Sequence, residues 1–254
     1  DLVRSRGLGD VYKRQGLVLP DVLGTYGDDG NALVLRERAR MRGIDADIKS
    51  ILLHDDIPTN LDIYTLGGGE DSAQLIAANR LAASPGLQAA AADGRPIFAI
   101  CAGLQVLGRT FRAHGNEVEG VGLLDVTTSP LSTRAIGEIV SQPTGAGITE
   151  SLTEPLTGFE NHMGATALGP DAAPLGKVTR GVGNGADAAS SVGDAKVDGV
   201  VQGSVIATYM HGPALARNPQ LADLLLARAL GIGLGELEPL ELPAVDKLRL
   251  ERLK

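Results

Sequence analysis

The only cysteine of the chain, Cys101, stands between a strand-like run and a helix-like run. Residues 96–100 suit a strand, and the small residues Ala102 and Gly103 allow a tight turn after the cysteine. The apolar residues that follow recur at helical spacing: Leu104, Leu107 and Phe111. A thiol in such a turn lies at the carboxyl edge of a sheet and at a helix N-terminus, whose dipole favours the thiolate. We therefore expect Cys101 to be a nucleophile, with a buried structural cysteine as the alternative.

A nucleophilic thiol needs a base, and acyl chemistry also needs hydrogen-bond donors for an oxyanion. His211 follows the apolar strand-like run 205–210, so we expect it at the same sheet edge as Cys101 and take it as the candidate base. The candidate oxyanion donors are the backbone N–H groups of Ala102 and of Gly68, which lies in a glycine triplet after another strand-like run. The alternatives are a structural histidine and a triplet that only forms a turn.

The elements that must position these residues alternate between strand and helix in the first half of the chain. The expected strands are residues 16–20, 44–51, 61–66 and 96–100. The expected helices are residues 31–42, 72–83 and 87–92. This alternation predicts a three-layer α/β fold, in which a mostly parallel, doubly wound sheet is flanked by helices on both faces.

The second half has a different pattern, with short strand candidates at hairpin-like spacing. These candidates are residues 121–127, 135–141 and 175–181. The segment 181–203 is rich in Gly, Ala, Asp and Ser and indicates a mobile hairpin or loop, and the last clear helix is expected over 220–230. We expect a single domain over residues 16–254, with a partly helical surface strap from about residue 231.

Residues 1–15 show neither helical nor strand periodicity, and the chain carries no initiating methionine. We expect these residues to be a non-native leader that resembles a translated cloning adaptor. A genuine disordered leader is the alternative.

The composition limits the classes of protein to which the chain can belong. With 254 residues and a net charge of −8, the chain has no basic stripe of the kind that binds nucleic acid. No apolar run approaches the ~18 residues of a membrane helix, and the start lacks the apolar core of a signal peptide. One free cysteine fits a reducing, cytoplasmic location. The four histidines are scattered without metal-ligand spacing, so we expect no metal site.

Several motifs resemble those of the class I glutamine amidotransferases. Cys-Ala-Gly-Leu-Gln, starting at Cys101, looks like the nucleophile elbow of that family, 66–70 like its Gly-rich oxyanion strand, and 209–212 like its CobB/CobQ-like branch. Further motifs are similar to those of GatD-type glutaminase subunits of lipid II isoglutaminyl synthase: 26–31, 67–71, 158–162 and 211–219. The resemblance covers about residues 16–230 and implies a flavodoxin-like fold.

This resemblance implies that L-glutamine is the substrate, with Cys101 attacking its carboxamide and His211 as the base. It also carries over Arg134 as a binding residue for the substrate α-carboxylate, which suits a guanidinium fork. Gln105 matches the family's C-x-G-x-Q pattern and is expected to shape the pocket. The alternatives are a solvated surface arginine and a helix-surface amide. Turn formation and helix capping explain most of the neighbouring Tyr26, Asp28 and Asn31 without a function.

One departure from the family pattern concerns the acid of the catalytic triad. Most class I members carry a glutamate two residues beyond the catalytic histidine, where this chain has Pro213. The resemblance implies that an aspartate of a partner subunit completes the triad across the interface. Glutaminase activity is then expected to be weak for the isolated chain and stronger in the complex.

The implied complex is a heterodimer with a Mur-ligase-like synthetase subunit of the MurT type. The glutaminase supplies ammonia, and the partner amidates the D-glutamate α-carboxylate of lipid II, the peptidoglycan precursor, to D-isoglutamine. We expect no cofactor in this chain, and we expect ATP and Mg²⁺ on the partner, because the chain has no G-x-x-x-x-G-K-[ST] loop. Two other interpretations stay open: the glutaminase domain of a cobyrinate or cobyric acid amidating system, and a non-catalytic partner-binding subunit on the same scaffold.

Overall fold

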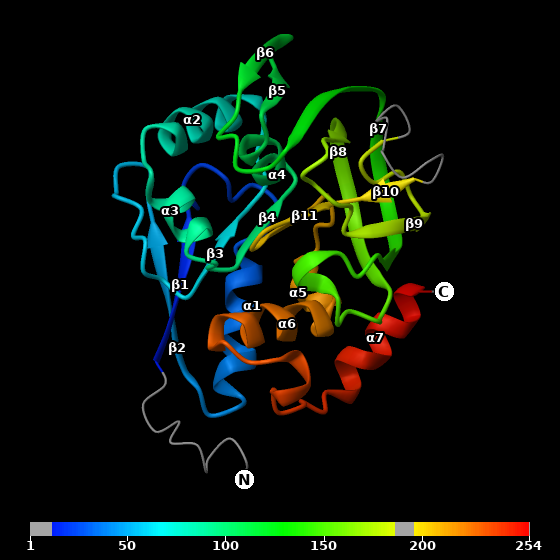
Figure 1. Cartoon of the computed structure of the whole chain (residues 1–254). Helices are drawn as coiled ribbons and strands as arrows, with labels where there is room; N and C mark the ends of the chain where they lie inside the picture. Colours follow the sequence, from blue (N-terminus) through cyan, green and yellow to red (C-terminus); the bar gives the residue numbers. More distant parts are fainter. Residues whose placement is uncertain (1–11, 186–195, 254) are drawn as a thin grey trace.

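The core of the protein is a six-stranded sheet in the order β11-β12-β4-β3-β1-β2, shown in the computed structural model of Figure 1. The structure describes residues 12–185 and 196–253. The strands of this sheet are β1 (Tyr12–Val18), β2 (Asp45–Ile51), β3 (Ile63–Leu66), β4 (Ile97–Ile100), β11 (Val200–Gln202) and β12 (Val205–Thr208). All neighbours pair in parallel except β11 and β12. Without β11 this is a flavodoxin-like strand order, which confirms the predicted doubly wound α/β class.

Helices cover both faces of this sheet. They are α1 (Gly30–Arg40), α2 (Asp71–Ala82), α3 (Gly86–Ala92), α4 (Ala102–Leu107), α5 (Ala214–Arg217), α6 (Pro219–Leu230) and α7 (Pro243–Leu253). Short 3₁₀ turns lie at Gly147–Thr149 and Leu234–Glu236. Helix α1 packs with α5 and α6, whereas α2 packs with α4 (Figure 1). Because parallel crossovers are right-handed and the chain leaves the β1–β3 centre in opposite directions, α1 and α2 lie on opposite faces.

A second sheet of mostly antiparallel strands packs beside the first. Its order is β10-β9-β7-β5-β6, and β8 also pairs with β7. The strands are β5 (Thr110–Ala113), β6 (Asn116–Glu119), β7 (Val126–Pro143), β8 (Leu156–Leu168), β9 (Gly176–Arg180) and β10 (Val197–Asp198). An isolated antiparallel bridge between Phe159 and His211 joins β8 to the residue just beyond the end of β12. The two sheets therefore meet at the edge where the sequence predicts the chemistry.

Several predictions for the second half are wrong in detail. Only the end of the strand candidate 121–127 and the whole of 135–141 belong to one long strand, β7, whose register shifts between Pro130 and Ala135; residues 121–125 precede this strand. The helix after Cys101 ends at Leu107, because Gly108 takes an extended conformation, and Phe111 consequently lies in β5. Strand β8 and the β5–β6 hairpin were not predicted at all.

The predicted boundaries at the ends of the chain also need adjustment. Of the expected leader, residues 1–11 lie outside the described residues, whereas 12–15 form the start of β1 and pair with β2. Residues 186–195 of the Gly-rich segment lie outside the described residues, and its second end supplies β10 and β11. The predicted C-terminal strap contains helix α7.

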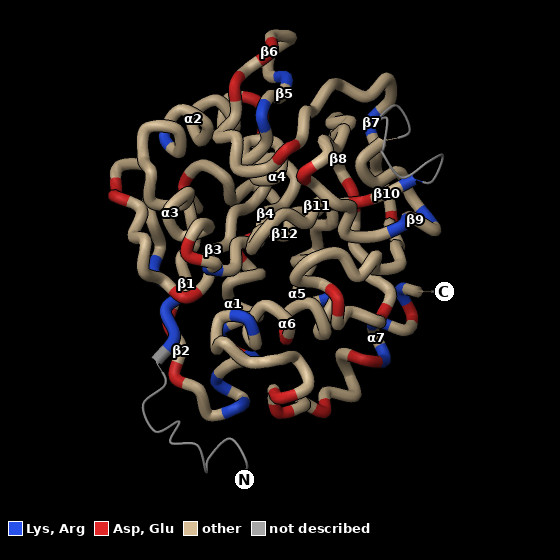
Figure 2. The backbone as a smooth tube through the Cα atoms, viewed as in Figure 1, with Lys and Arg blue, Asp and Glu red and all other residues tan. Residues whose placement is uncertain are grey.

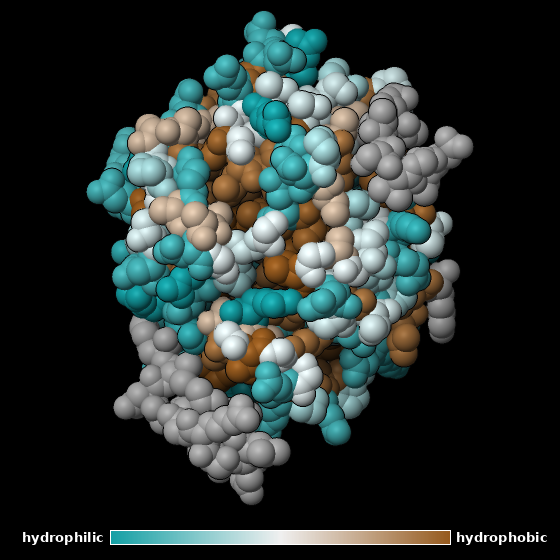
Figure 3. Space-filling model, viewed as in Figure 1, coloured by the Kyte–Doolittle hydropathy of each residue, from teal (hydrophilic) through white to brown (hydrophobic). Residues whose placement is uncertain are grey.

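The surface gives little sign of a single charged face. Acidic and basic residues are interspersed along the tube in Figure 2. In the same view, Figure 3 shows brown apolar side chains gathered along the middle of the molecule. No helix among the described residues is long and apolar enough to cross a membrane.

The central strand β4 leads directly into the predicted site, and all four of its residues are buried. Phe98 is fully buried there, so Phe98→Ala leaves a cavity and is expected to lower the free energy of unfolding by about 3–5 kcal/mol. Urea unfolding followed by circular dichroism measures this loss. The control is Leu33→Ala on α1, where the side chain is 47% exposed and a change within about 0.5 kcal/mol is expected. Equal losses for both variants would contradict this account of the core.

Candidate active site

Cys101 occupies a strained turn between β4 and α4. Its backbone has φ 51° and ψ −103°, a conformation that residues other than glycine rarely adopt. Such strain persists only where the surroundings enforce it, and here the buried strand β4 and the buried helix α4 hold both sides. The turn has the strand–nucleophile–helix form of a nucleophile elbow, and it presents the side chain to a pocket of about 310 Å³. The sequence prediction for the local structure of Cys101 is confirmed.

His211 lies beside this turn and is held by a carboxylate of the same chain. Its Nδ1 lies 3.1 Å from Oδ1 and 3.0 Å from Oδ2 of Asp28. A carboxylate only accepts hydrogen bonds, so Nδ1 carries the proton and donates it to Asp28. The side chains are 6% and 0% exposed, respectively. Within the described chain, Nε2 of His211 is buried without a conventional hydrogen-bond partner, and it is therefore the nitrogen left to exchange a proton with the thiol.

The charge state of His211 follows from these neighbours. Burial lowers the pKa of His211, but the hydrogen bond to Asp28 and the interaction with the nearby Cys101 outweigh it and raise the pKa to about 10. The imidazole is therefore protonated at neutral pH. A cationic imidazolium beside a sulfur atom is the environment in which cysteines become reactive.

Asp28 brings a carboxylate of the chain itself to His211, whereas the resemblance implied an aspartate of a partner subunit. Asp28 lies in the loop between β1 and α1, and it also accepts the backbone N–H of Gly68 at 2.9 Å. The carboxylate that contacts His211 thus comes from the N-terminal end of the chain rather than from the position of Pro213. The capping explanation for the neighbouring Asn31 is also wrong, because its side chain accepts the N–H of Leu215 at 2.9 Å from inside α1.

The same contact corrects the predicted oxyanion donors. Because the N–H of Gly68 is engaged by Asp28, it is not free for an oxyanion in this structure. A Cβ at Gly68 would lie 3.0 Å from Cε1 of His211 and 3.1 Å from Oδ2 of Asp28, so a side chain there would crowd this pair. The next residue, Gly69, lines the pocket, and Ala102 is the first residue of α4, whose N–H has no partner within its own helix. The N–H groups of Gly69 and Ala102 stay candidates for oxyanion donors.

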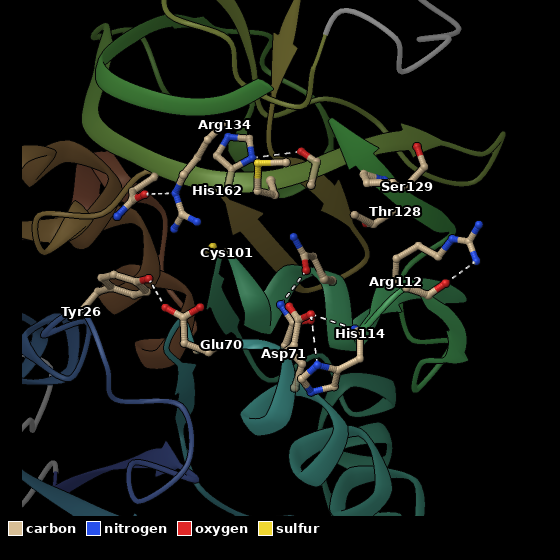
Figure 4. A pocket seen from close by; sticks show the side chains of 18 residues that line it. Tyr26, Glu70, Asp71, Cys101, Arg112, His114, Thr128, Ser129, Arg134 and His162 are labelled. Carbon is tan, nitrogen blue, oxygen red and sulfur yellow. Dashed lines mark hydrogen bonds and ion pairs between the residues drawn. The ribbon is translucent and has the colours of Figure 1, made fainter. Parts of the chain in front are cut away.

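The pocket around Cys101 is shared between the two sheets (Figure 4). The first sheet and its helices contribute Tyr26, Gly69, Glu70, Asp71, Gln74, Cys101 and Gln105. The second sheet and its turns contribute Arg112, His114, Gly115, Thr128, Ser129, Pro130, Arg134, Asn161, His162, Met163 and Gly164. The structure thus places the predicted residues Arg134 and Gln105 at one pocket with Cys101.

Arg134 reaches this pocket from β7. Its Nε donates to Oδ1 of Asn161 on β8 at 2.7 Å, which fixes the plane of the guanidinium. Its contact with glutamine stays a prediction. Asn161, which belongs to the motif 158–162, holds Arg134 in this orientation.

Gln105 is buried in the pocket wall, so the interpretation as a helix-surface amide is wrong. Its Oε1 accepts from Gln74 at 2.7 Å, and its Nε2 donates to the hydroxyl of Tyr209 at 3.1 Å. Burial raises the pKa of Tyr209, which keeps the phenol neutral, and the hydroxyl continues the network to Thr166 at 2.6 Å. Because both ends of its amide are used, Gln105 is a rigid part of the wall.

His162 is a buried residue of the second sheet that sequence reasoning did not place at the site. Its ring stacks on Tyr209 with centroids 3.8 Å apart, and its Nδ1 lies 2.9 Å from the carbonyl of Gly164. The motif 158–162 contained this residue, but its alternation gave no indication of the direction in which the side chain points. No group of three or more potential ligands that could hold a metal ion occurs in the described part of the chain.

A family model for the CobB/CobQ-like glutamine amidotransferase domain matches residues 16–219, a range that contains every residue of this site. The chain belongs to this family. It is therefore a glutamine amidotransferase of the CobB/CobQ-like type, as the motifs around Cys101 and His211 predicted.

Two curated members of this group are each 35% identical to the chain. Both are named lipid II isoglutaminyl synthase (glutamine-hydrolyzing) subunit GatD. The protein from Streptococcus pneumoniae matches over 90% of this chain and 84% of its own length, and that from Staphylococcus aureus over 83% and 82%. A cobyric acid synthase from Sphingopyxis alaskensis is 33% identical over 68% of this chain but only 32% of its own length.

Solved structures give the same fold at low sequence identity. A glutamine amidotransferase from Thermotoga maritima has a TM-score of 0.52 at 13% identity, covering 94% of this chain and 93% of its own. The glutaminase domain of Trypanosoma brucei CTPS, solved with bound acivicin, has a TM-score of 0.53 at 12% identity, covering 87% and 94%. At these identities the likeness establishes the fold of the amidotransferase and nothing finer.

The hydrogen bond to Asp28 predicts how this amidotransferase responds to pH. The pKa of His211 is about 10 in the folded state and about 6.5 in an unfolded chain, so the folded state binds more protons between these values. The stabilisation is therefore complete below about pH 6.5 and is lost as the pH rises through about 10. Asp28→Asn is expected to lower the pKa of His211 and to flatten this dependence.

NMR titration of His211 and urea unfolding between pH 6.5 and 10 measure both effects. Asp93→Asn, at an exposed turn after α3, removes the same charge and serves as the control. An unchanged pKa of His211 in Asp28→Asn would show that Asp28 does not hold the imidazole.

Proposed function

We propose that Cys101, His211 and Asp28 hydrolyse L-glutamine to glutamate and ammonia. The observation that carries this proposal is the buried contact of His211 Nδ1 with Asp28, at 3.0 Å, beside a cysteine in a strained elbow. The membership in a glutamine amidotransferase family supports the choice of substrate. The contact between Asp28 and His211 also favours an enzyme over a non-catalytic subunit, because it provides a carboxylate in place of the acid that is absent after His211.

In the proposed first half-reaction, the sulfur of Cys101 attacks the carboxamide carbon of glutamine and forms a tetrahedral intermediate. The N–H groups of Gly69 and Ala102 stabilise its oxyanion. His211 gives its Nε2 proton to the departing nitrogen, the C–N bond breaks, and ammonia leaves a γ-glutamyl thioester behind. Asp28 keeps the other proton on Nδ1 and stabilises the imidazolium before this transfer.

In the second half-reaction, water attacks the thioester carbon and gives a proton to Nε2 of His211. The C–S bond then breaks, glutamate is released, and sulfur and imidazolium return to their starting charges. Each step uses groups of this chain alone, so the proposed hydrolysis needs no metal or organic cofactor here.

The proposed destination of the ammonia is a Mur-ligase-like synthetase of the MurT type, in a cytoplasmic heterodimer with this chain. By likeness to the GatD subunits, the partner would hold ATP and Mg²⁺ and amidate the D-glutamate α-carboxylate of lipid II. The near-complete coverage of both GatD relatives favours this assignment over a cobyric acid synthase, of which the chain matches only 32%.

Replacement of Cys101 tests the hydrolysis itself. Cys101→Ala is expected to abolish glutamate release, and Asp28→Asn is expected to lower kcat by about 10²- to 10⁴-fold, because the imidazole loses its orientation and its charge partner. Glutamate release is measured by a coupled dehydrogenase assay, with Asp93→Asn as the control. An unchanged rate for Cys101→Ala would remove the enzyme assignment.

Assembly with the synthetase is tested separately. Glutamate release by the chain alone is compared with release after co-purification with the Mur-ligase-like protein of the same organism, and the complex is expected to be faster. Equal rates would contradict the dependence on assembly. Persistence of the faster rate when Asp28→Asn is placed in the complex would show that the partner supplies an acid of its own.

A further inference from the structure

A second cavity, of about 380 Å³, is lined by residues of α5 and α7 and by the segment just before α5. Helix α7 packs against α5 and β8 and lies at the lower right in Figure 1. The cavity shares no lining residue with the pocket around Cys101. Its volume lies within the range of about 300–1,000 Å³ that is usual for small-molecule sites, so it is large enough for a ligand of its own.

Every charged side chain that lines this cavity, within the described part of the chain, is an arginine: Arg217 on α5, and Arg249 and Arg252 on α7. Two of them share one carboxylate, because Glu138 accepts from Arg217 through Oε2 and from Arg252 through Oε1. Arg249 pairs at 3.1 Å with Glu154, which is 46% exposed. Three guanidinium charges thus face two carboxylates, neither of which lines the cavity, and the cavity keeps an excess of positive charge.

Two of these arginines have a buried N–H group that the protein leaves unsatisfied. The Nε atoms of Arg217 and Arg249 have no hydrogen-bond partner, and no other arginine or lysine in the described ranges has such a buried nitrogen. The guanidinium groups are fixed by other contacts, from Arg217 to Thr157 at 3.0 Å and from Arg249 to the carbonyl of Pro155 at 2.6 Å. A buried donor is costly unless an acceptor satisfies it, so two fixed donors on one cavity indicate an anionic ligand.

The remaining lining residues carry no charge, and most of them are apolar. They are Gly212, Ala216, Val245 and Leu248, of which Leu248 is 63% exposed and therefore borders the opening of the cavity. Pockets for small molecules combine such apolar walls with a few fixed polar groups. A ligand that fills this cavity consequently needs an apolar body as well as an oxyanion.

We propose that this cavity binds a small phosphate monoester with an apolar organic body, whose phosphate oxygens accept the Nε–H groups of Arg217 and Arg249. A phosphate monoester carries a charge of about −1.5 to −2 at pH 7 and three strong acceptor oxygens. It therefore suits a group of arginines that outnumbers its carboxylates better than a carboxylate ligand with two oxygens does. The ligand also lies beside Gly212, the residue that follows His211, and it ties α7 to α5.

The test compares three probes in four proteins. Isothermal titration calorimetry at constant ionic strength near pH 7 measures the binding of n-butyl phosphate, inorganic phosphate and n-butanol to the full chain. The proteins are the unaltered chain, Arg217→Gln, Arg249→Gln and the control Arg40→Gln. Arg40 lies on α1, forms ion pairs with Glu37 and Asp47, and is outside the cavity, so the control removes the same charge elsewhere.

For the unaltered chain we expect n-butyl phosphate to bind more tightly than inorganic phosphate, by roughly fourfold for each methylene group that it buries, and n-butanol not to bind. Each of Arg217→Gln and Arg249→Gln should raise the Kd for n-butyl phosphate by about tenfold to a hundredfold, the range of one charge-assisted hydrogen bond. Arg40→Gln should bind as the unaltered chain does. Saturating n-butyl phosphate should also raise the Tm of the unaltered chain, because it binds the folded state.

Three results would overturn the proposal. The first is no binding of either phosphate, the second is an unchanged Kd in both cavity variants, and the third is equal affinity for the two phosphates, which would leave the apolar walls without a role. Circular dichroism checks that the variants fold, and Arg249→Gln keeps the test decisive if Arg217→Gln does not, since α7 has no buried residue. Binding is measured without glutamine, so its outcome is independent of the glutaminase assay on Cys101→Ala.

Discussion

The buried carboxylate of Asp28 is the interaction on which the site depends. It has no exposed surface, and it accepts from both the imidazole of His211 and the backbone N–H of Gly68. A buried carboxylate is costly unless such partners satisfy it, and these two partners come from the ends of two different strands. The carboxylate of Asp28 therefore connects three segments: the β1–α1 loop, the β3–α2 turn and the end of β12. Each fixes the others at the carboxyl edge of the sheet.

The same charge engages the backbone N–H of Gly68, the glycine that the sequence predicts as an oxyanion donor. The N–H of Gly68 turns inward to Asp28, so the following residue, Gly69, is the one that faces the pocket. The strained φ of Cys101 is set by the neighbouring strand, since β4 and α4 are buried on both sides of the turn. The strained backbone of Cys101 is thus held by β4 and α4, whereas the charged imidazole of His211 is held by Asp28. The pocket lies between these two parts of the sheet.

The sequence predicted those parts of the site that leave a local pattern in the chain. Continuous apolar runs ending in Cys101, His211 and the glycine triplet placed these residues on one edge, because parallel strands bury both faces and end together. The partner of His211 was not predicted, because Asp28 lies 183 positions away in an irregular loop that has no periodicity. Pairwise contacts between loops are a property of the folded sheet, and a single sequence contains no local signal for them.

Strand β8 was missed for a different reason, which is its inverted pattern. The polar residues Glu160 and His162 are buried, whereas Phe159 and Met163 are 39% and 41% exposed. Both residues have hydrogen-bond partners inside the second sheet: Glu160 accepts the N–H groups of Val182 and Gly183, and Nδ1 of His162 lies 2.9 Å from the carbonyl of Gly164. The alternation of polar and apolar residues along β8 therefore predicts the wrong face of the strand as the buried one. The hydrogen bonds that allow the polar face to be buried are seen only in the folded structure.

The glycines of β8 give this strand its place against the nucleophile. A side chain at Gly158 would collide with Met210, and one at Gly164 would collide with Gln105 and Tyr209, so the strand approaches the first sheet closely only because both positions are glycine. At this distance Phe159 exchanges both backbone hydrogen bonds with His211, at 3.1 Å and 2.9 Å. The base is consequently fixed by a side-chain contact to the β1–α1 loop and by backbone contacts to the second sheet. The site is therefore one rigid unit built from both sheets. The second sheet provides the wall with Asn161 and Arg134, and the first sheet provides the edge with Cys101.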